Sequence, residues 1–460
     1  MARLGRLANL ERSTWVRILL GVALIGRLAA IPFVGDHSIA YEWGVLAKNL
    51  VAGRGYSYYE VLTDGVVRIS SMAPGSTPIP SAYMPPLYAF LMAGLLKLLG
   101  SDFGAASAVT VIQAILGTAT AWLVYRSAEL VVSRRAAIWA LAVYAVFPLG
   151  VYASAQVSAV VLYVFLAQLT LWLLLEWRYG AHSHARQLAP AVLSAGLLLL
   201  ARGEALAIVA VFAVWVLVVS DPQVRRPRNL GAIRRLANCA CFSLPAIALA
   251  VPWTLRNLSA FGTLTSPTAS GGYNLWQGQN SNATGIHGGS VTPPVVEGGH
   301  LRRLIDALPG TNDYELRRDN LYLHDALQAI SADPARSVIL GLKKIAMYWT
   351  NLYPGVSINY PGAQSPLIVV PWLTIVILAI AGIVGLRRQW LRASIIHLYV
   401  ITNTLVIAVF FVMPRYNLAV LPCVAIFAAA GIDWLATRPR QHGGVRSSER
   451  RTLDKSVLPS

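Results

Sequence analysis

WVRILLGVALIGRLAAIPFV, residues 15–34, is an apolar run that is long enough to cross a lipid bilayer as one helix. About 20 apolar residues in a helix span a hydrocarbon core of about 30 Å. Arg3, Arg6, Arg12 and Arg17 lie at or before its start, and no small-residue cleavage site follows it. We therefore expect an uncleaved first span that runs outward from the cytoplasm, rather than a removable signal peptide.

The rest of the chain has the same apolar character. Of 460 residues, 56% are hydrophobic and 13% are charged, and the mean hydropathy is +0.56. This composition is too apolar for a soluble domain and predicts a polytopic membrane protein. The net charge of +18 could also indicate nucleic-acid binding, but the arginines cluster in short gaps between apolar runs, which is typical of cytoplasmic loops. These clusters include Arg134–Arg135, Arg225–Arg235 and Arg387–Arg392.

Placing the basic gaps on the inner side predicts an all-α protein with about ten transmembrane helices, in a range of about 9–12. The predicted spans are residues 15–34, 104–131, 136–152, 155–175, 188–201, 205–220, 238–255, 366–386, 393–413 and 417–436. Both termini are then cytoplasmic, and we expect a bacterial inner membrane.

This path divides the chain into four parts. They are an N-terminal transmembrane module at 1–255, an outer segment at 256–365, C-terminal transmembrane helices at 366–436 and a disordered basic tail at 437–460. The N-terminal module includes a first outer loop at 35–103.

Three further helices are expected on the outer side. MPPLYAFLMAGLLKLLG, residues 84–100, is short and carries a lysine, so we expect an interfacial helix in the first outer loop. Helical patterns occur near 312–331 and 334–352, and the second is amphipathic with Lys343 and Lys344, as expected on a membrane surface.

Residues 188–220 would form a helix about 50 Å long, which exceeds the bilayer core. Two short spans that meet at Arg202-Gly203-Glu204 fit better. Charged residues at such a turn are either paired with each other or belong to a functional site, and the sequence leaves both alternatives open.

GDHSIAYEWGVLAKNLVAGRGYS, residues 35–57, follows the first span directly. Its apolar residues Ile39, Trp43, Leu46 and Leu50 are spaced so that they would lie along one face of a helix. Asp36 is placed to cap the helix, and Glu42 falls in its second turn at the boundary between lipid and water. A partly desolvated carboxylate there can act as a general base. The pattern alone favours the alternative, an ordinary cap at Asp36 and a solvated acid at Glu42, because both are common.

Five segments, taken in order, resemble a known family. They are YEWGVLAKNLVAGRGYS (41–57), MPPLYAFLMAGLLKLLG (84–100), VPWTLRNLSAFG (251–262), GGYNLWQGQN (271–280) and MPRYNLAVLPCVAIFAAAG (413–431). They are similar to motifs of the C-type integral membrane glycosyltransferases, which include protein O-mannosyltransferases and the aminoarabinose transferases that act on lipid A.

The resemblance implies that a polyprenyl-phosphate sugar donates its sugar, with inversion, to a lipid, glycan or protein acceptor. A carboxylate of the first outer loop would activate the acceptor hydroxyl. Many relatives have an Asp-Glu pair where this chain has Ile39 and Ala40, and some have His or Lys where it has Met84. The catalytic candidates are therefore Glu42 first and Asp36 second.

Basic residues at the outer ends of spans are the candidates for the donor phosphate. Arg256 and Arg415 lie in the resembling motifs and can bind phosphate through two donors. Lys343 is a weaker candidate. The alternative for all three is contact with lipid head groups.

A sugar or acceptor pocket could include Asn274, Trp276 and Asn280, together with Arg202. The alternative for the first three is a glycine-rich turn around a buried tryptophan.

No metal or nucleotide motif is present, and His182 and His184 are the only closely spaced histidine pair. We expect no obligatory cofactor, although two acids can hold a divalent ion without a motif. Two other functions remain open: a transporter or flippase of lipid-linked sugars, and a non-catalytic subunit that binds polyprenyl phosphate. A transporter is expected to show internal repeats and ionisable groups near the bilayer midplane.

Overall fold

The structure is a computed structural model. It describes residues 2–39, 42–180, 188–219, 228–265, 268–286, 299–353 and 365–437, with the backbone alone for 2–13 and 228–230. Within these residues the chain is mostly helical, as predicted. Ala40, the pair His182 and His184, and the basic tail after Thr437 lie outside the described residues.

The helices that follow the predicted spans form one bundle. They are α1 (Ala2–Val34), α4 (Asp102–Val131), α5 (Arg134–Val146), α6 (Pro148–Ala155), α7 (Val160–Tyr179), α8 (Leu188–Leu199), α9 (Ala205–Val218), α10 (Arg228–Phe261), α15 (Pro366–Gly385), α16 (Ser394–Val409) and α17 (Asn417–Thr437). Among the described residues, six helices are long and apolar enough to cross a membrane, or seven if α5 and α6 form one span. Shorter apolar helices, α8, α9 and α16, occupy three other predicted spans. A multi-pass membrane protein is thus confirmed, whereas the count of about ten stays a prediction.

The span predicted at 136–152 is bent by 50° between α5 and α6. Pro148 has no N–H, so the carbonyl of Tyr144 loses its helical partner there. The buried guanidinium of Arg27 compensates, because Nη1 donates to Ala145 O at 3.0 Å and Nη2 to Tyr144 O at 3.4 Å. A cation at the C-terminal end of α5 is also favoured by the helix dipole.

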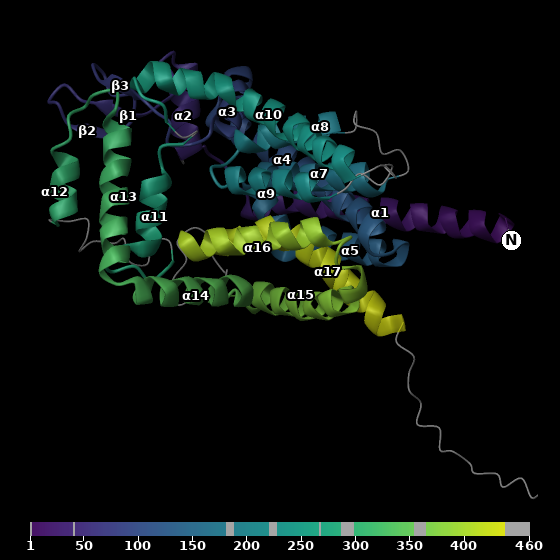
Figure 1. Ribbon diagram of the computed structural model, residues 1–460. Coiled ribbons are helices and arrows are strands. Elements are labelled where there is room, and N and C mark those ends of the chain that lie inside the picture. Colours follow the sequence, from purple (N-terminus) through teal and green to yellow (C-terminus); the bar gives the residue numbers. More distant parts are fainter. Residues whose placement is uncertain are drawn as a thin grey trace, which may run out of the picture.

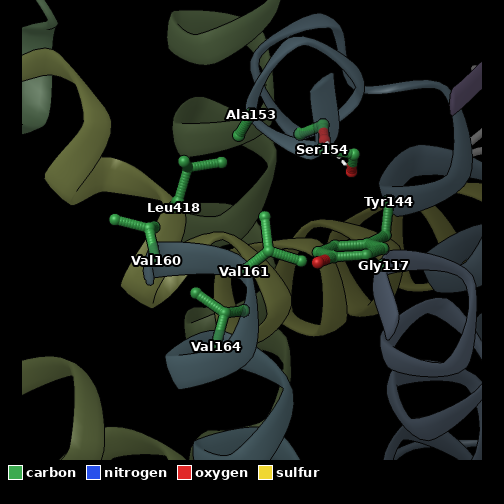
Figure 2. Close-up of a pocket in the computed structure, with 9 residues that line it drawn as sticks. Gly117, Tyr144, Ala153, Ser154, Val160, Val161, Val164 and Leu418 are labelled. Atoms are coloured by element: carbon green, nitrogen blue, oxygen red, sulfur yellow. Dashed lines mark hydrogen bonds between the residues drawn. The ribbon is translucent and has the colours of Figure 1, made fainter. Parts of the chain in front are cut away.

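A small cavity lies at this bend (Figure 2). Its polar lining is Tyr144 and Ser154, and its apolar lining comes from α6, α7 and α17. Gly117 on α4 forms one wall, and a Cβ there would lie 2.6 Å from Arg27 Nε. The absence of a side chain at this position therefore lets Arg27 reach the bend.

The connections between helices gather at two opposite ends. At one end, Val157 N donates to Asp36 Oδ2 at 2.8 Å, and Leu87 N donates to Leu200 O at 3.0 Å. At the other end, Ser133 Oγ donates to Asp433 Oδ2 at 2.9 Å. Figure 1 shows the strands and α11–α13 at the first end (left) and the N-terminal end of α1 pointing away from them (right). We call the first end the loop end.

The first outer loop contains two helices and a sheet. The helices are α2 (Glu42–Val51) and α3 (Pro86–Leu99), and the strands are β1 (Ser57–Val61), β2 (Val67–Ile69) and β3 (Thr77–Pro80), paired antiparallel in the order β2-β1-β3. Helix α3 matches the prediction for 84–100 and packs on α2 and α4. The sheet corrects the expectation of an all-α chain. Its Asp64-Gly65 turn, with φ of 85° at Gly65, is a recognisable hairpin signal.

Glu60 of β1 holds this loop together from a fully buried position. Its carboxylate accepts hydrogen bonds from Ser71 N at 2.9 Å and Ser76 Oγ at 2.8 Å, and it pairs with Arg54 at 3.0 Å and Arg68 at 3.4 Å. Burial works to raise the pKa of Glu60, but these hydrogen bonds outweigh it and lower the pKa to about 2. The loop is therefore pinned by an ionised carboxylate.

The outer segment contributes four helices, α11 (Gly271–Gln279), α12 (His300–Asp306), α13 (Tyr314–Ala332) and α14 (Pro334–Thr350). The predictions for 312–331 and 334–352 are confirmed as helices. Short 3-10 turns lie at Arg387–Gln389 and Pro414–Tyr416. Lys344 of α14 is buried and donates to the carbonyls of Ala408, Val409 and Phe410 at the end of α16. This contact fixes the outer segment to the bundle.

Candidate functional site

Glu42 is the first residue of α2, not a second-turn residue as the sequence predicted. An acid in the first turn is favoured by the helix dipole. The side chain is half-buried at the loop end. Its negative charge acts on the hydroxyls of Tyr58 and Tyr83 from the first outer loop and of Tyr273 from α11. Burial first, and this charge among others, raise the pKa of all three tyrosines, so they are neutral hydrogen-bond donors near Glu42.

Asp36 has a different environment from the one predicted. Its Oδ2 accepts a hydrogen bond from Val157 N at 2.8 Å, and its own N–H donates to Ala155 O at 3.0 Å. It therefore ties the end of α1 to the connection between α6 and α7 and does not cap α2, which starts six residues later. Burial raises the pKa of Asp36, and the Val157 N–H partly offsets this.

Arg318 on α13 lies among tyrosines that come from both outer parts of the chain. Its guanidinium is 5.3 Å from the ring of Tyr59, 5.5 Å from Tyr273 and 5.2 Å from Tyr322, and it donates a hydrogen bond to the Tyr59 hydroxyl. Tyr59 belongs to β1, whereas the other two rings belong to α11 and α13. Arg318 thus joins the first outer loop to the outer segment beside the neighbours of Glu42.

Glu315, one helical turn before Arg318, is a fully buried acid. Its Oε1 accepts from Ser81 Oγ at 2.8 Å and its Oε2 from Ala82 N at 2.6 Å. Burial raises its pKa to about 7, although these two hydrogen bonds and the charges of Arg318 and Arg256 act in the opposite direction. Carboxyl groups with such a raised pKa are found in functional sites and in buried structural contacts, and not on the solvated surface.

Arg256, near the C-terminal end of α10, is hydrogen-bonded to residues 35–103, the predicted first outer loop. Its Nη1 donates to Ser81 O at 2.6 Å, and its Nη2 donates to Tyr56 O at 3.0 Å. The guanidinium also lies over the rings of Trp253 at 5.0 Å and Tyr56 at 5.5 Å. The structure therefore places both terminal nitrogens on backbone carbonyls.

Arg202 and Arg415 come together at the loop end, around Tyr416. Arg202 pairs with Glu204 at 2.5 Å, which is one of the two alternatives that the sequence left open. Its guanidinium also lies 5.6 Å from the ring of Tyr416 and 5.7 Å from that of Tyr163. Arg415 also acts electrostatically on Tyr416, and its half-buried side chain has a buried Nε with no hydrogen-bond partner among the described residues. Of these two cations, Arg202 is paired with the Glu204 carboxylate.

The glycine-rich motif forms α11. Trp276 is 1% exposed and donates from Nε1 to Asp325 at 2.8 Å, and Asn280 is buried and donates to Trp276 O at 2.8 Å. Asp319 accepts the N–H groups of Gly272 and Tyr273 at the start of the helix. Asn274 is half-buried. Trp276 and Asn280 therefore have complete internal contacts, which leaves Asn274 as the more accessible member of the predicted pocket.

Lys343 is exposed on α14, next to the buried Lys344. Burial, and then the charge of Arg336, lower the pKa of Lys344 to about 7. In the part of the chain that the structure describes, no three His, Cys, Asp or Glu side chains are grouped to hold a metal ion.

Comparison with known proteins gives a family-model match over part of the chain and a similar fold. Residues 83–253 match the family model of dolichyl-phosphate-mannose-protein mannosyltransferases. The crystal structure of the Archaeoglobus fulgidus oligosaccharyltransferase with a tethered acceptor peptide matches 92% of this chain and 49% of its own, at 12% identity and a TM-score of 0.54. The oligosaccharyltransferase AglB of the same organism, in complex with an inhibitory peptide and a dolichol-phosphate, matches 91% of this chain and 50% of its own, at 15% identity and a TM-score of 0.52.

The resemblance to C-type integral membrane glycosyltransferases is thereby confirmed. The chain spans about half the length of these solved proteins, and at such low identity they show the fold alone. A likeness to ArnT from Cupriavidus metallidurans has a TM-score of 0.38, which is too low to add to this. No curated protein sequence matches the chain.

Proposed function

We propose that this protein is a membrane glycosyltransferase that transfers a sugar from a polyprenyl-phosphate donor to an acceptor hydroxyl, with Glu42 as the general base. The observation that carries this proposal is the position of Glu42, half-buried and close to three tyrosine hydroxyls, at the end of the bundle where Arg202 and Arg415 also lie. The family model and the dolichol-phosphate bound to the archaeal relative support the class of donor. The loop end would then be the outer face of a bacterial inner membrane, with both termini in the cytoplasm.

The reaction follows from the groups present. Glu42 accepts the proton of the acceptor hydroxyl while the oxygen of that hydroxyl forms a bond to the anomeric carbon of the donor sugar. The bond between that carbon and the phosphate oxygen breaks, and its electron pair leaves on the phosphate. Attack from the side opposite to the phosphate inverts the anomeric centre. The neutral tyrosines can donate hydrogen bonds to sugar oxygens, and Asn274 can do so from α11.

The leaving phosphate needs positive charge at the membrane surface. Arg415 has an unused buried Nε, and Arg202 lies beside the same tyrosine, so we assign the phosphate to this pair. Arg256 and Lys343 stay secondary candidates, because Arg256 uses both terminal nitrogens on carbonyls and Lys343 is exposed.

The test is transfer of label from a panel of polyprenyl-phosphate sugars by the protein in lipid nanodiscs. Glu42→Gln keeps the size of the side chain but cannot accept a proton, so we expect the rate to fall by about 10²–10⁴ while donor binding is kept. Asp64→Asn, an exposed acid in the same loop, is the matched control and should keep full turnover.

Asp36→Asn separates the two catalytic candidates. Asparagine can still accept the Val157 N–H through its oxygen, so a purely structural Asp36 predicts near-normal transfer. Full turnover in Glu42→Gln with a dead Asp36→Asn would reverse the assignment. Donor binding without transfer from any sugar by the wild type would favour the non-catalytic binding subunit.

A further inference from the structure

The segment Ser81–Pro85, between β3 and α3, is held at almost every backbone polar group. Ser81 N donates to Tyr56 O at 2.8 Å, and Ser81 O accepts from Arg256 at 2.6 Å. Ala82 N donates to Glu315 at 2.6 Å, and Ala82 O accepts from Ala269 N at 2.7 Å.

Its second half is fixed in the same way. Tyr83 N donates to Ser81 Oγ at 3.0 Å, and the Tyr56 hydroxyl donates to the carbonyls of Met84 at 2.8 Å and Pro85 at 3.2 Å. A connection with so many partners from distant elements is far more constrained than an ordinary surface loop.

Glu315 is the acid in this set of contacts, and it comes from the outer segment. One oxygen binds the Ala82 N–H, and the other binds the Ser81 hydroxyl, which in turn accepts the N–H of Tyr83. The carboxylate thus controls the backbone on both sides of Ala82. Removing it would leave a buried N–H and a buried hydroxyl without an acceptor.

Tyr83 is the side chain that this segment presents. It stacks on Tyr58 with ring centroids 5.0 Å apart and an interplanar angle of 12°. Tyr58 is buried, whereas Tyr83 is half-buried, and Glu42 lies within electrostatic reach of both. Tyr83 is therefore the more accessible side chain of this stacked pair.

We propose that Tyr83 contacts the substrate by donating a hydrogen bond to a sugar oxygen beside Glu42, and that Glu315 is the positioning residue that fixes Tyr83 through Ser81 and Ala82. The part concerning Tyr83 rests on the proposed function. The part concerning Glu315 is independent of it, because it concerns how the segment is held.

Two measurements on the full chain in nanodiscs test this inference. The first is amide hydrogen exchange of the peptide that covers Ser81–Pro85. Glu315→Ala should speed its exchange about tenfold or more, because the Ala82 N–H and the Ser81 hydroxyl both lose their acceptor. Glu315→Gln keeps one acceptor oxygen and should speed the exchange by a smaller factor. Asp313 is an acid two residues earlier that makes a partly exposed pair with Arg317 and accepts a hydrogen bond from the Thr311 hydroxyl. Asp313→Asn is therefore the matched control and should leave the exchange unchanged.

The second measurement is transfer kinetics with the polyprenyl-phosphate sugar that the wild type uses. Tyr83→Phe should leave the exchange of the segment unchanged and lower kcat/KM about fivefold to tenfold, as expected for one lost hydrogen bond. Glu315→Ala should lower kcat about tenfold or more, with the donor dissociation constant unchanged, because misplacement affects the reaction rather than lipid binding. The ring of Tyr314 packs against that of Tyr59, with ring centroids 5.4 Å apart. Tyr314→Phe removes only its hydroxyl and should change neither the hydrogen exchange of Ser81–Pro85 nor kcat/KM.

Unchanged exchange in both Glu315 variants would overturn the positioning role. Full kcat/KM in Tyr83→Phe would overturn the substrate contact. If the wild type transfers no sugar, the proposed function and the role of Tyr83 both fail, whereas the exchange measurement still decides the role of Glu315.

Discussion

Glu315 gives the sharpest pH-dependent prediction. Burial raises the pKa of this carboxyl from an ordinary 4.5 to about 7, against the opposing effect of two hydrogen bonds and two arginines. At 1.36 kcal/mol per pH unit, the difference corresponds to roughly 3 kcal/mol. The groups that face it are Arg256, Arg318 and the hydroxyls of Tyr56, Tyr58 and Tyr59. None of them changes charge between pH 4.5 and 7, so the titration belongs to Glu315.

The sign follows from proton linkage. Between pH 4.5 and 7 the folded protein binds more protons at Glu315 than the unfolded chain does, so stability decreases as the pH rises. The contribution is fully present below about pH 4.5 and is lost as the pH passes about 7. Glu315→Gln cannot titrate and should lack this component.

The assay is the thermal unfolding midpoint of both proteins in nanodiscs from pH 4.5 to 8. For a chain of 460 residues, an unfolding entropy of about 2.1 cal/mol/K per residue converts roughly 3 kcal/mol to about 3 °C. The midpoint of the wild type minus that of Glu315→Gln should therefore fall by about 3 °C across this range. Two parallel pH profiles would refute the reasoning, because they would mean that the carboxyl titrates alike in both states.

Three other predictions concern the phosphate site, the bend and the topology. Arg415→Ala should weaken polyprenyl-phosphate binding about tenfold or more, and Lys343→Ala should change it less than twofold; equal effects in a binding titration would favour general attraction to lipid head groups. Gly117→Ala places a Cβ 2.6 Å from Arg27 Nε and should lower stability by about 1–3 kcal/mol, measured as a lower unfolding midpoint. A reporter fused at Gly100 should lie on the outer side, and a cytoplasmic signal there would contradict the predicted path.

Most of the helices were predictable because they are long or strongly periodic, whereas the short helices α11 and α12 were not predicted. The spans, the 84–100 helix, and the helices near 312–331 and 334–352 follow from apolar runs and amphipathic stripes, which are local properties of the sequence. The bend at Pro148 was not predicted, although a proline inside a helical run indicates a kink. The sheet was missed although Asp64-Gly65 between two short β-branched stretches indicates a hairpin.

The site was predictable only in part, because it is built by contacts across long sequence separations. Glu42 and Arg415 are candidates because of the resembling motifs, and Arg202 because of its place at a turn between two spans, but the sequence did not predict that Arg202 and Arg415 lie near the same tyrosine. Glu315 and Arg318 had no motif, and on a helical pattern they look like solvated residues. What assigns them a role is contact with Ser81 and Tyr59, more than 230 residues earlier in the chain.

These long-range contacts change how the first outer loop should be understood. A general base near a membrane surface works only if the groups around it are fixed, and here one of its three tyrosine neighbours, Tyr273, comes from the outer segment. Arg318 and Glu315 bind the first outer loop from the same segment. The chemistry that we assign to Glu42 therefore depends on docking of the outer segment, and a loss of that docking should reduce the rate of transfer before it affects the binding of the lipid at Arg415.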